Sequence, residues 1–375
     1  AFTMLDHLAS VDGMGPVGEI RLVPDPETFV VAPYVPHTGV ALFDMVTLDG
    51  KPYEADGRAF LKRMVDRAAG RDLSIVAAFE PEWSLARRDG ENFTPLDDSG
   101  CFTTTGMNMS AEVIDEIVAA LESQGLTVEQ YYAELGWGQQ ELSIRHAPAL
   151  RAADNQVIYR ETVRGVALKH GLYASFAPKP WGNQAGNGCH LHFSGWDQDG
   201  TVNRFYERGA RYGLSELGRQ FMAGVLDHLS GPVALTCASV NSYRRLQPPV
   251  WASASRAWGP DRRGGPLRPH SPFPRHGHDR PTVHATPGSG PSPQDAVACD
   301  TPGWDGQLLA DGRAGGGAEA SVLRVLDVAS GQGLAESIDR AHASTITWRA
   351  DNRSFFYFKF NKVTPETPPS ETEFN

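Results

Sequence analysis

The regular spacing of apolar residues in this chain of 375 residues ends near Trp258, and this limits how much of it can form one fold. Between Arg262 and Gln294 the only acidic residue is Asp279, and proline, glycine, arginine and histidine crowd the run. Such a segment has neither the period of a helix nor that of a strand. We therefore expect the main folded region to lie before this run.

The chain before the break mixes short apolar runs with longer amphipathic stretches. The runs at 19–48 are separated by proline-rich turns and predict a β meander. The whole pattern is typical of an α+β fold with helices packed on an antiparallel sheet. We expect four segments: 1–50, a small N-terminal domain; 51–258, a large domain; 259–317, an irregular run; and 318–375, a weakly ordered end with a disordered tail from Lys362.

Individual elements are predicted from the same periods. Helices are expected at 59–69, 110–123 (capped by Ser110), 154–170 (closed by Gly171) and 214–229. Strands are expected at 73–85, 134–144, 172–177 and 189–194, the last two paired with each other.

Composition narrows the classes of function. The net charge of −11 argues against a nucleic-acid binder, which would need a basic face. No apolar run approaches the roughly 18 residues of a membrane helix, and no secretory signal is visible, so we expect a cytoplasmic protein without a membrane partner. The cysteines form no CxxC pair and are expected to be reduced and buried: Cys101, Cys189, Cys237 and Cys299.

Two pairs of glutamates are candidate cation ligands. Glu80 and Glu82 are two residues apart in a predicted strand and so share a face, where they repel each other unless a cation lies between them. Glu134 and Glu141 bracket a glycine-rich bend that lets both point at one centre. The alternative for the first pair is a solvated strand face, and for the second a turn with exposed acids.

A histidine strand and an arginine cluster complete the candidate residues. His190, His192 and Ser194 share a strand face after a glycine-rich turn. A carboxylate-rich site with one imidazole suits Mg²⁺ or Mn²⁺ better than Zn²⁺, although a strand histidine can be purely structural. Arginines grip phosphates and carboxylates bidentately, with surface salt bridges as the alternative. The cluster comprises Arg244, Arg245, Arg262, Arg263 and Arg268.

These elements, in this order, resemble the glutamine synthetase family from about Asp12 to Trp258. The resemblance includes the runs at 21–25 and 179–180. Residues 138–147 and 153–156 are similar to stretches of bacterial glutamine synthetase-like γ-glutamylamide ligases. The resemblance implies a β-grasp domain, shortened here, a large α+β catalytic domain, and assembly into homo-oligomeric rings. It also implies two substrates besides ATP, namely glutamate and an amine.

The resemblance also implies residue roles. One divalent metal, Mg²⁺ or Mn²⁺, would be held by Glu82, Glu134 and Glu141, and a second by Glu80 and His190. ATP would lie near Glu129, His192, Ser194 and Arg268. The amino-acid substrate would contact Gly186 and Arg245, and Arg263 would contact the transferred phosphoryl group. ATP would phosphorylate the γ-carboxylate of glutamate, and an amine would then displace phosphate.

Two departures from the family pattern concern the amine. The ammonia-using members carry Asp-Gly-Ser-Ser, whose aspartate helps bind ammonium, whereas this chain has Asp12-Gly13-Met14. Those members also place a glutamate six residues after the substrate arginine, where this chain has Trp251. An indole removes a partner for ammonium and adds an apolar wall. We therefore expect an organic amine; ammonia, as in ordinary glutamine synthetase, is the alternative.

A third departure concerns the C-terminal part. The family's Glu-x-Arg strand and Asn-Pro-Tyr helix start are missing, and the run 280–285 stands in their place. Asp261-Arg262-Arg263 replaces Asp-Asn-Arg. We interpret the sequence from about Pro260 as out-of-frame translation of GC-rich DNA, with a diverged tail as the alternative. A non-catalytic relative with an assembly or regulatory role is the rival from another functional class.

Overall fold

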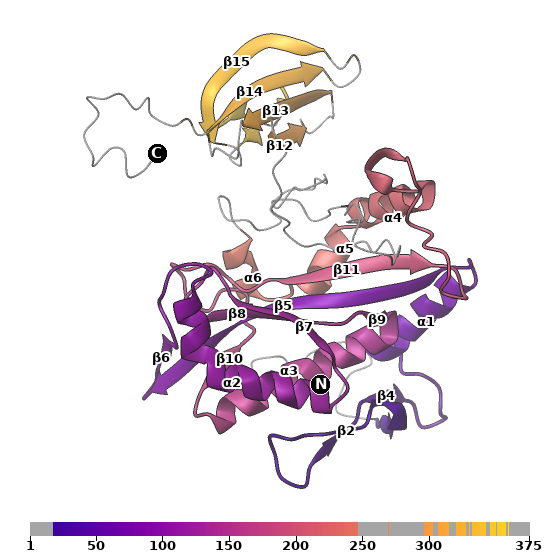
Figure 1. Ribbon diagram of the computed structural model, residues 1–375. Helices are drawn as coiled ribbons and strands as arrows, with labels where there is room; N and C mark the ends of the chain where they lie inside the picture. The colour runs from indigo at the N-terminus through magenta and orange to yellow at the C-terminus, as the bar shows by residue number, and fades with distance from the viewer. Residues whose placement is uncertain are drawn as a thin grey trace. The chain divides into compact units, whose positions relative to one another are not determined.

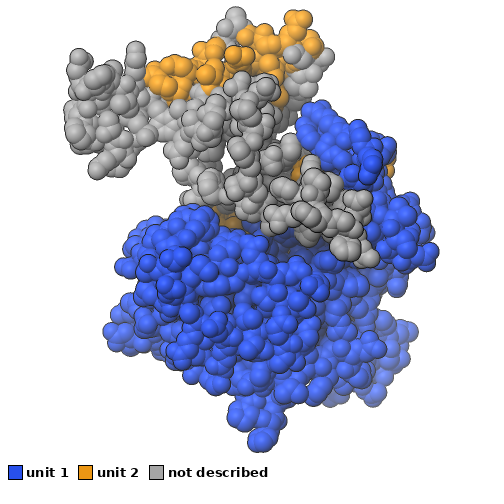
Figure 2. Space-filling view, in the orientation of Figure 1, with its two compact units in different colours: residues 1–219, 271–284 blue, residues 220–270, 285–375 orange. Residues whose placement is uncertain are grey.

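The chain divides into two compact units in this computed structural model. One comprises Ala1–Arg219 with Ser271–His284, and the other comprises Gln220–His270 with Ala285–Asn375 (Figure 2). The structure describes residues 18–246, 269, 296–302, 307–314, 320–327, 330, 332–342, 346–349, 351–357 and 359.

The first described strands form two small antiparallel pairs. β1 (Arg21–Pro24) pairs with β4 (Phe43–Val46), and β2 (Val30–Val31) pairs with β3 (Gly39–Val40). A short 3-10 turn, η1 (Pro26–Thr28), follows β1. The strands predicted for 19–48 are therefore present, but the meander pairing is wrong, because the outer strands pair around the inner ones.

One long strand, β5 (Ser74–Asp89), organises the main sheet of seven strands. It pairs antiparallel with every other member of the sheet except β7 (Val128–Ala133), which pairs with β8. Its direct neighbours are β6 (Asn92–Pro95), β8 (Gln139–Ile144), β9 (Ala147–Pro148), β10 (Tyr173–Ser175) and β11 (Cys189–Trp196).

This topology corrects two strand predictions. The strand predicted at 134–144 is a bend followed by β8, because the glycines at 136 and 138 turn the chain. The strands β10 and β11 do not pair with each other, since each pairs with β5.

Helices cover one face of this sheet. Figure 1 shows α2 (Thr104–Ser123) and α3 (Ala149–Lys169) side by side against it, with α1 (Gly57–Ala69) farther along. The core between helices and sheet includes Trp83, Leu85, Ile117, Leu142, Tyr159 and Val163. Burying each aliphatic or phenylalanine-sized side chain stabilises the fold by about 1.5–3 kcal/mol.

A buried hydrogen-bond chain ties this core together. The indole Nε1 of Trp83 donates to the hydroxyl of Tyr159 at 3.0 Å. That hydroxyl in turn donates to the backbone oxygen of Leu142 at 2.9 Å. Because Tyr159 belongs to α3 and the other two to β5 and β8, the chain fixes the helix against both strands.

The helix boundaries differ from the predicted ones at two N-termini. The N-cap of α2 is Thr103, whose hydroxyl accepts from the backbone NH of Gly106. Ser110 lies inside this helix, buried, and donates to the backbone oxygen of Gly106 at 2.8 Å. α3 begins directly after Pro148. Gly171 has φ +69° and follows the end of α3, as its sequence predicts.

Several short helices follow β11 at the C-terminal end of the described range 18–246. They are η2 (Arg211–Gly213), α4 (Glu216–Asp227), α5 (Ser230–Thr236) and α6 (Val240–Arg245). The predicted helix at 214–229 is therefore present as α4. Among the described residues, no helix is long and apolar enough to cross a membrane.

The C-terminal part contains a four-stranded antiparallel sheet. Its order is β12 (Ala296–Pro302), β13 (Leu308–Ala314), β14 (Ala320–Asp327) and β15 (Gly333–His342). A hairpin of β16 (Thr347–Trp348) and β17 (Phe355–Phe356) follows. A small core contains Ala310, Leu323, Val325, Ala341 and Trp348.

This sheet corrects the prediction of an irregular segment at 259–317, because β12 and β13 lie within it. The glycines and single apolar residues of these strands hid the alternation from the sequence. The predicted disordered tail from Lys362 lies outside the described residues.

Candidate active site

The alternation of β5 separates a core face from a polar face. Trp83 and Leu85 pack toward the helices, so Glu80, Glu82 and Ser84 belong to the opposite face. Antiparallel register places Glu141 of β8 directly opposite Glu82. Directly opposite residues share a face, so two carboxylates from separate parts of the chain meet there.

A third carboxylate reaches the same place from the bend before β8. Carboxylate oxygens of Glu82, Glu134 and Glu141 all lie within 4.8 Å of one another. The bend is held by a hydrogen bond from the backbone NH of Glu134 to the oxygen of Gln139 at 2.8 Å. Gly138 has φ +62°, and a Cβ there would meet the backbone oxygen of Leu85 at 2.5 Å. The close approach of the bend to β5 therefore requires glycine.

Glu80 lies beside two histidines of β11. Register places His190 opposite Glu80 and His192 two residues farther along. Oε2 of Glu80 lies 3.1 Å from Nδ1 of His190 and 3.1 Å from Nε2 of His192. Glu80 is 4% exposed and His192 is 8% exposed, so these two are shielded from water, whereas the side chain of His190 is 42% exposed.

The carboxylates differ in their affinity for protons. Burial raises the pKa of Glu141, and the nearby charge of Glu80 adds to the effect. Burial also raises the pKa of Glu134, with a contribution from Glu82. Burial alone would raise the pKa of Glu80, but hydrogen bonds from His190 and His192 outweigh it and hold that pKa below its ordinary value. The crowded carboxyl groups of Glu134 and Glu141 therefore favour bound protons, and a cation at the cluster would take the place of those protons.

Three other predicted site residues lie on β11, on β7 and in the loop before β11. Ser194 is buried in β11, and its hydroxyl accepts from the indole of Trp196 at 2.9 Å. Glu129, in β7, makes a salt bridge of 3.0 Å to Arg145, with both side chains substantially exposed. The backbone oxygen of Gly186 accepts from the side chain of Gln139 at 3.2 Å.

The remaining predicted residues are not brought to this cluster by any described contact. Arg245 is the last residue of α6 and belongs to the second unit. Outside the described residues lie Asp12, Trp251, Arg263, Arg268 and the run 280–285.

Two residues that contact the cluster, Tyr132 and Gln139, are not among those that the sequence predicts. The hydroxyl of Tyr132 donates to Oε1 of Glu141, directly across from it in β7. The side chain of Gln139 donates to Glu82 at 2.7 Å. Gln139 lies in the run 138–147 that carries the family resemblance, whereas only the pairing of β7 with β8 reveals the position of Tyr132.

The cysteines do not follow their prediction. Cys101 and Cys189 are exposed and Cys237 is partly exposed, so the expectation of buried thiols is wrong for these three. Cys299 lies in β12.

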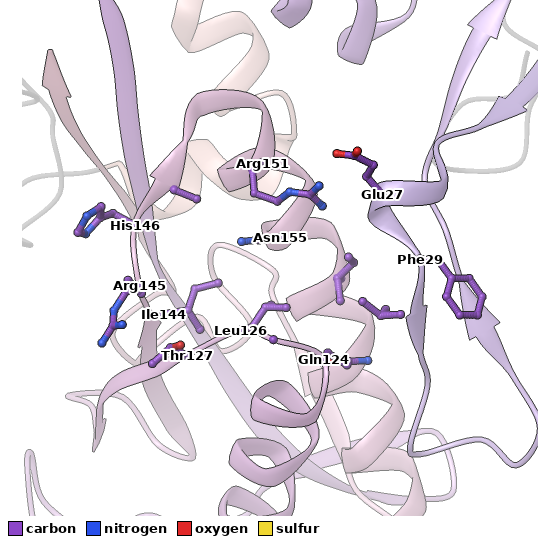
Figure 3. A pocket seen from close by; sticks show the side chains of 14 residues that line it. Glu27, Phe29, Gln124, Leu126, Thr127, Ile144, Arg145, His146, Arg151 and Asn155 are labelled. Carbon is purple, nitrogen blue, oxygen red and sulfur yellow. The ribbon is translucent and has the colours of Figure 1, made fainter. Parts of the chain in front are cut away.

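A separate pocket of about 390 Å³ lies away from these carboxylates. Its walls come from the η1–β2 region, the turn after α2, the end of β8 and the start of α3 (Figure 3). Figure 3 shows Arg151 and Asn155 on α3 across from Glu27. None of the residues that line it belongs to the carboxylate cluster.

Family comparison agrees with this geometry. The model of the glutamine synthetase catalytic domain matches residues 54–280, which include the whole carboxylate cluster. The chain belongs to the glutamine synthetase family. The model of the glutamine synthetase N-terminal domain matches residues 1–58. The predicted family and the predicted α+β fold are therefore confirmed.

Curated relatives in this family carry different names. The chain is 38% identical over 267 residues to gamma-glutamylpolyamine synthetase GlnA3 of Streptomyces coelicolor, covering 70% of this chain and 57% of that protein. It is 34% identical over 269 residues to glutamine synthetase of Halobacterium salinarum, covering 69% and 59%. The chain thus spans somewhat more than half the length of these relatives.

Solved structures show the same likeness. A crystal structure of a novel glutamine synthase homolog superposes with a TM-score of 0.67 at 33% identity, covering 74% of this chain and 65% of that one. Apo GmaS without ligand superposes with a TM-score of 0.59 at 34% identity, covering 63% and 56%.

The C-terminal sheet matches a different family. Residues 296–373 match the model of the prolyl oligopeptidase N-terminal β-propeller domain. Propellers are built from four-stranded antiparallel blades, the form that β12 to β15 takes here. Out-of-frame translation gives no reason for such a match, so that interpretation is weakened for residues 296–373.

Proposed function

We propose that this chain is an ATP-dependent carbon–nitrogen ligase that forms a γ-glutamyl amide from glutamate and an amine. The observation that carries the proposal is the meeting of Glu82, Glu134 and Glu141 within 4.8 Å on one sheet face. Three carboxylates from two strands and a bend would repel one another in a purely structural role. Family membership supplies the reaction type that such a site serves.

The donor set fits magnesium or manganese. Carboxylate oxygens are the ligands that these hard cations prefer, and imidazole nitrogen is acceptable to manganese. Glu82, Glu134 and Glu141 would hold one ion, and Glu80 with His190 a second. When bound, the ions would neutralise charge on the phosphoryl group transferred from ATP.

Hydrogen bonds from other residues of the chain orient the proposed metal ligands. Tyr132 and the backbone NH of Gly188 each hold one carboxylate oxygen, of Glu141 and Glu82 respectively. Such partners orient ligands before an ion arrives. His190 and His192 hold Glu80 ionised by donating to its Oε2. We assign Glu129, His192, Ser194 and Arg268 to ATP, Gly186 and Arg245 to glutamate, and Arg263 to the phosphoryl group.

The proposed amine is organic rather than ammonia. Trp251 and the Asp12-Gly13-Met14 run replace the residues that ammonia-using members place near ammonium. Gamma-glutamylpolyamine synthetase GlnA3, by its name, acts on polyamines, and the chain is 38% identical to it. Ordinary glutamine synthetase activity is the second candidate, favoured by the names of other relatives.

We further assign residues 1–50 to the β-grasp domain and 51–258 to the catalytic domain, in a protein that assembles into a homo-oligomeric ring in the cytoplasm. The two family matches meet at 54–58, which supports that boundary.

The proposal is tested by following phosphate release from ATP with glutamate, Mn²⁺ and a panel of amines that includes ammonia. We expect an alkylamine or polyamine to give the highest rate, and Glu134→Ala to abolish release. Glu161→Ala, an exposed change on α3, is the control and should leave the rate unchanged. Highest turnover with ammonia would favour glutamine synthetase. No melting shift with Mn²⁺ or ATP would favour a non-catalytic relative.

A further inference from the structure

Gln139 is an uncharged residue in direct contact with the carboxylate cluster, through Glu82. It is 2% exposed and lies on β8, two residues from Glu141 and therefore on the same face. A primary amide has one acceptor oxygen and two donor hydrogens. The amide oxygen and the amide nitrogen of Gln139 make hydrogen bonds to different parts of the site.

The amide oxygen of Gln139 closes the bend that carries Glu134. It accepts from the backbone NH of Gly136 at 2.7 Å. The backbone oxygen of Gly136 also accepts from the NH of Gln139 at 3.0 Å. A Cβ at position 136 would lie 2.7 Å from this amide oxygen, so any larger residue there would push the Gln139 side chain away from its present position.

The amide nitrogen of Gln139 reaches two other segments. It donates to Oε2 of Glu82 at 2.7 Å and to the backbone oxygen of Gly186 at 3.2 Å. Glu82 belongs to β5, and Gly186 belongs to the loop before β11. One side chain therefore connects three segments that are far apart in the sequence.

We propose that Gln139 is a positioning residue that sets the distance between the metal ligands Glu82 and Glu134 and fixes Gly186 relative to them. This inference rests on the proposed function, because it takes those glutamates as ligands and Gly186 as a contact of glutamate. Gln139 itself would touch neither the ion nor the substrate. Its loss would leave all carboxylates present but no longer held at one spacing.

The chain offers a matched control in the next residue. Gln140 is fully buried on the same strand but belongs to the helix-facing side, since it lies opposite Trp83 and accepts from Ser110 of α2. Its amide accepts from the hydroxyl of Tyr131 at 2.6 Å and donates to the oxygen of Gly138 at 3.2 Å. Gln140→Met therefore removes a comparable buried amide without touching Glu82 or Gly186.

The test is direct titration of Mn²⁺ into the full chain by calorimetry, which needs no ligase activity. We expect Gln139→Met to weaken Mn²⁺ binding by about 10- to 100-fold, the usual cost of losing a residue that orients metal ligands. Gln140→Met should bind Mn²⁺ like the unchanged protein. Equal affinities for Gln139→Met and the unchanged protein, or equal weakening by both variants, would overturn the inference.

A second variant covers the case in which Gln139→Met does not fold. Gln139→Glu keeps the size and the acceptor for Gly136 but replaces the donor to Glu82 and Gly186. We expect the KM for glutamate to rise about 10-fold or more while the KM for ATP changes little. An unchanged KM for glutamate would contradict the role at Gly186. Absence of Mn²⁺ binding by the unchanged protein would overturn the proposed function itself, and this inference with it.

Discussion

Glu141 has a carboxylate that both burial and its neighbour Glu80 push toward the protonated form. Glu134 is shifted in the same direction by burial. A carboxyl whose pKa is raised in the folded state binds protons there that the unfolded chain has already released. The metal-free protein therefore loses stability as the pH rises from about 4.5 toward the raised pKa values.

A divalent cation changes this dependence, because it must displace the protons from both carboxyl groups. We expect the rise in melting temperature caused by Mn²⁺ to be larger at about pH 8 than at about pH 6, since fewer protons compete at the higher pH. Differential scanning calorimetry measures the shift. Glu141→Gln removes one of the competing groups and should reduce the pH dependence. A shift of the same size at both pH values would contradict this explanation.

At the scale of elements, Arg58 joins the N-terminal strands to the helices. Its guanidinium lies 2.6 Å from carboxylate oxygens of Asp25 and Asp44, and Nε lies 3.0 Å from Oδ1 of Asp154. Asp154 is 4% exposed and lies in α3. One side chain of α1 thus ties the end of β1, β4 and α3 together.

Removing this guanidinium would leave Asp154 buried without its cation. We expect Arg58→Met to lower the free energy of unfolding by about 3–5 kcal/mol, measured by urea denaturation. Arg67→Met, an exposed change in the same helix, should stay within about 0.5 kcal/mol of the unchanged protein. A loss as small as that of Arg67→Met would show that the network is not a determinant of stability.

The sequence predicts the helices and strands whose apolar residues recur at a regular spacing. It does not predict features that depend on contacts with residues far away in the chain. The regular spacing of their apolar residues predicts the helices α1 and α4 and the long strand β5. Ser110 is not the cap that the sequence predicts, because it lies inside α2, where its hydroxyl bonds to Gly106 of the same helix and to Tyr131 and Gln140 on strands β7 and β8. The glutamates were identifiable from the family motif, whereas the connecting role of Gln139 needed the bend, β5 and the loop before β11 to be seen together.

At the scale of the whole molecule, two units with separate cores share one chain. Trp348 is 5% exposed and packs edge-on against Phe355, with ring centroids 4.9 Å apart, in the C-terminal core. The carboxylate cluster belongs to the other unit. We therefore expect a substitution in one core to change the stability of that unit and not of the other.

We expect Trp348→Ala to destabilise the C-terminal sheet by about 3–5 kcal/mol and to leave the Mn²⁺-dependent melting shift unchanged. Tyr357→Ala, at a position 38% exposed, should cost much less. Calorimetry of the full chain with and without Mn²⁺ separates the two effects. Loss of the Mn²⁺ shift in Trp348→Ala would show that the units are thermodynamically coupled.

The pairing of β5 has a practical consequence for anyone refolding this protein. Glu80 and Glu82 lie on that strand, and Glu141 and His190 lie on its direct neighbours. A slip of β5 by one residue would turn both of its glutamates to the core side. Aqueous manganese gives sharp paramagnetic resonance lines that broaden when protein ligands hold the ion, so the loss of the sharp signal would report the fraction of molecules whose strands had aligned correctly.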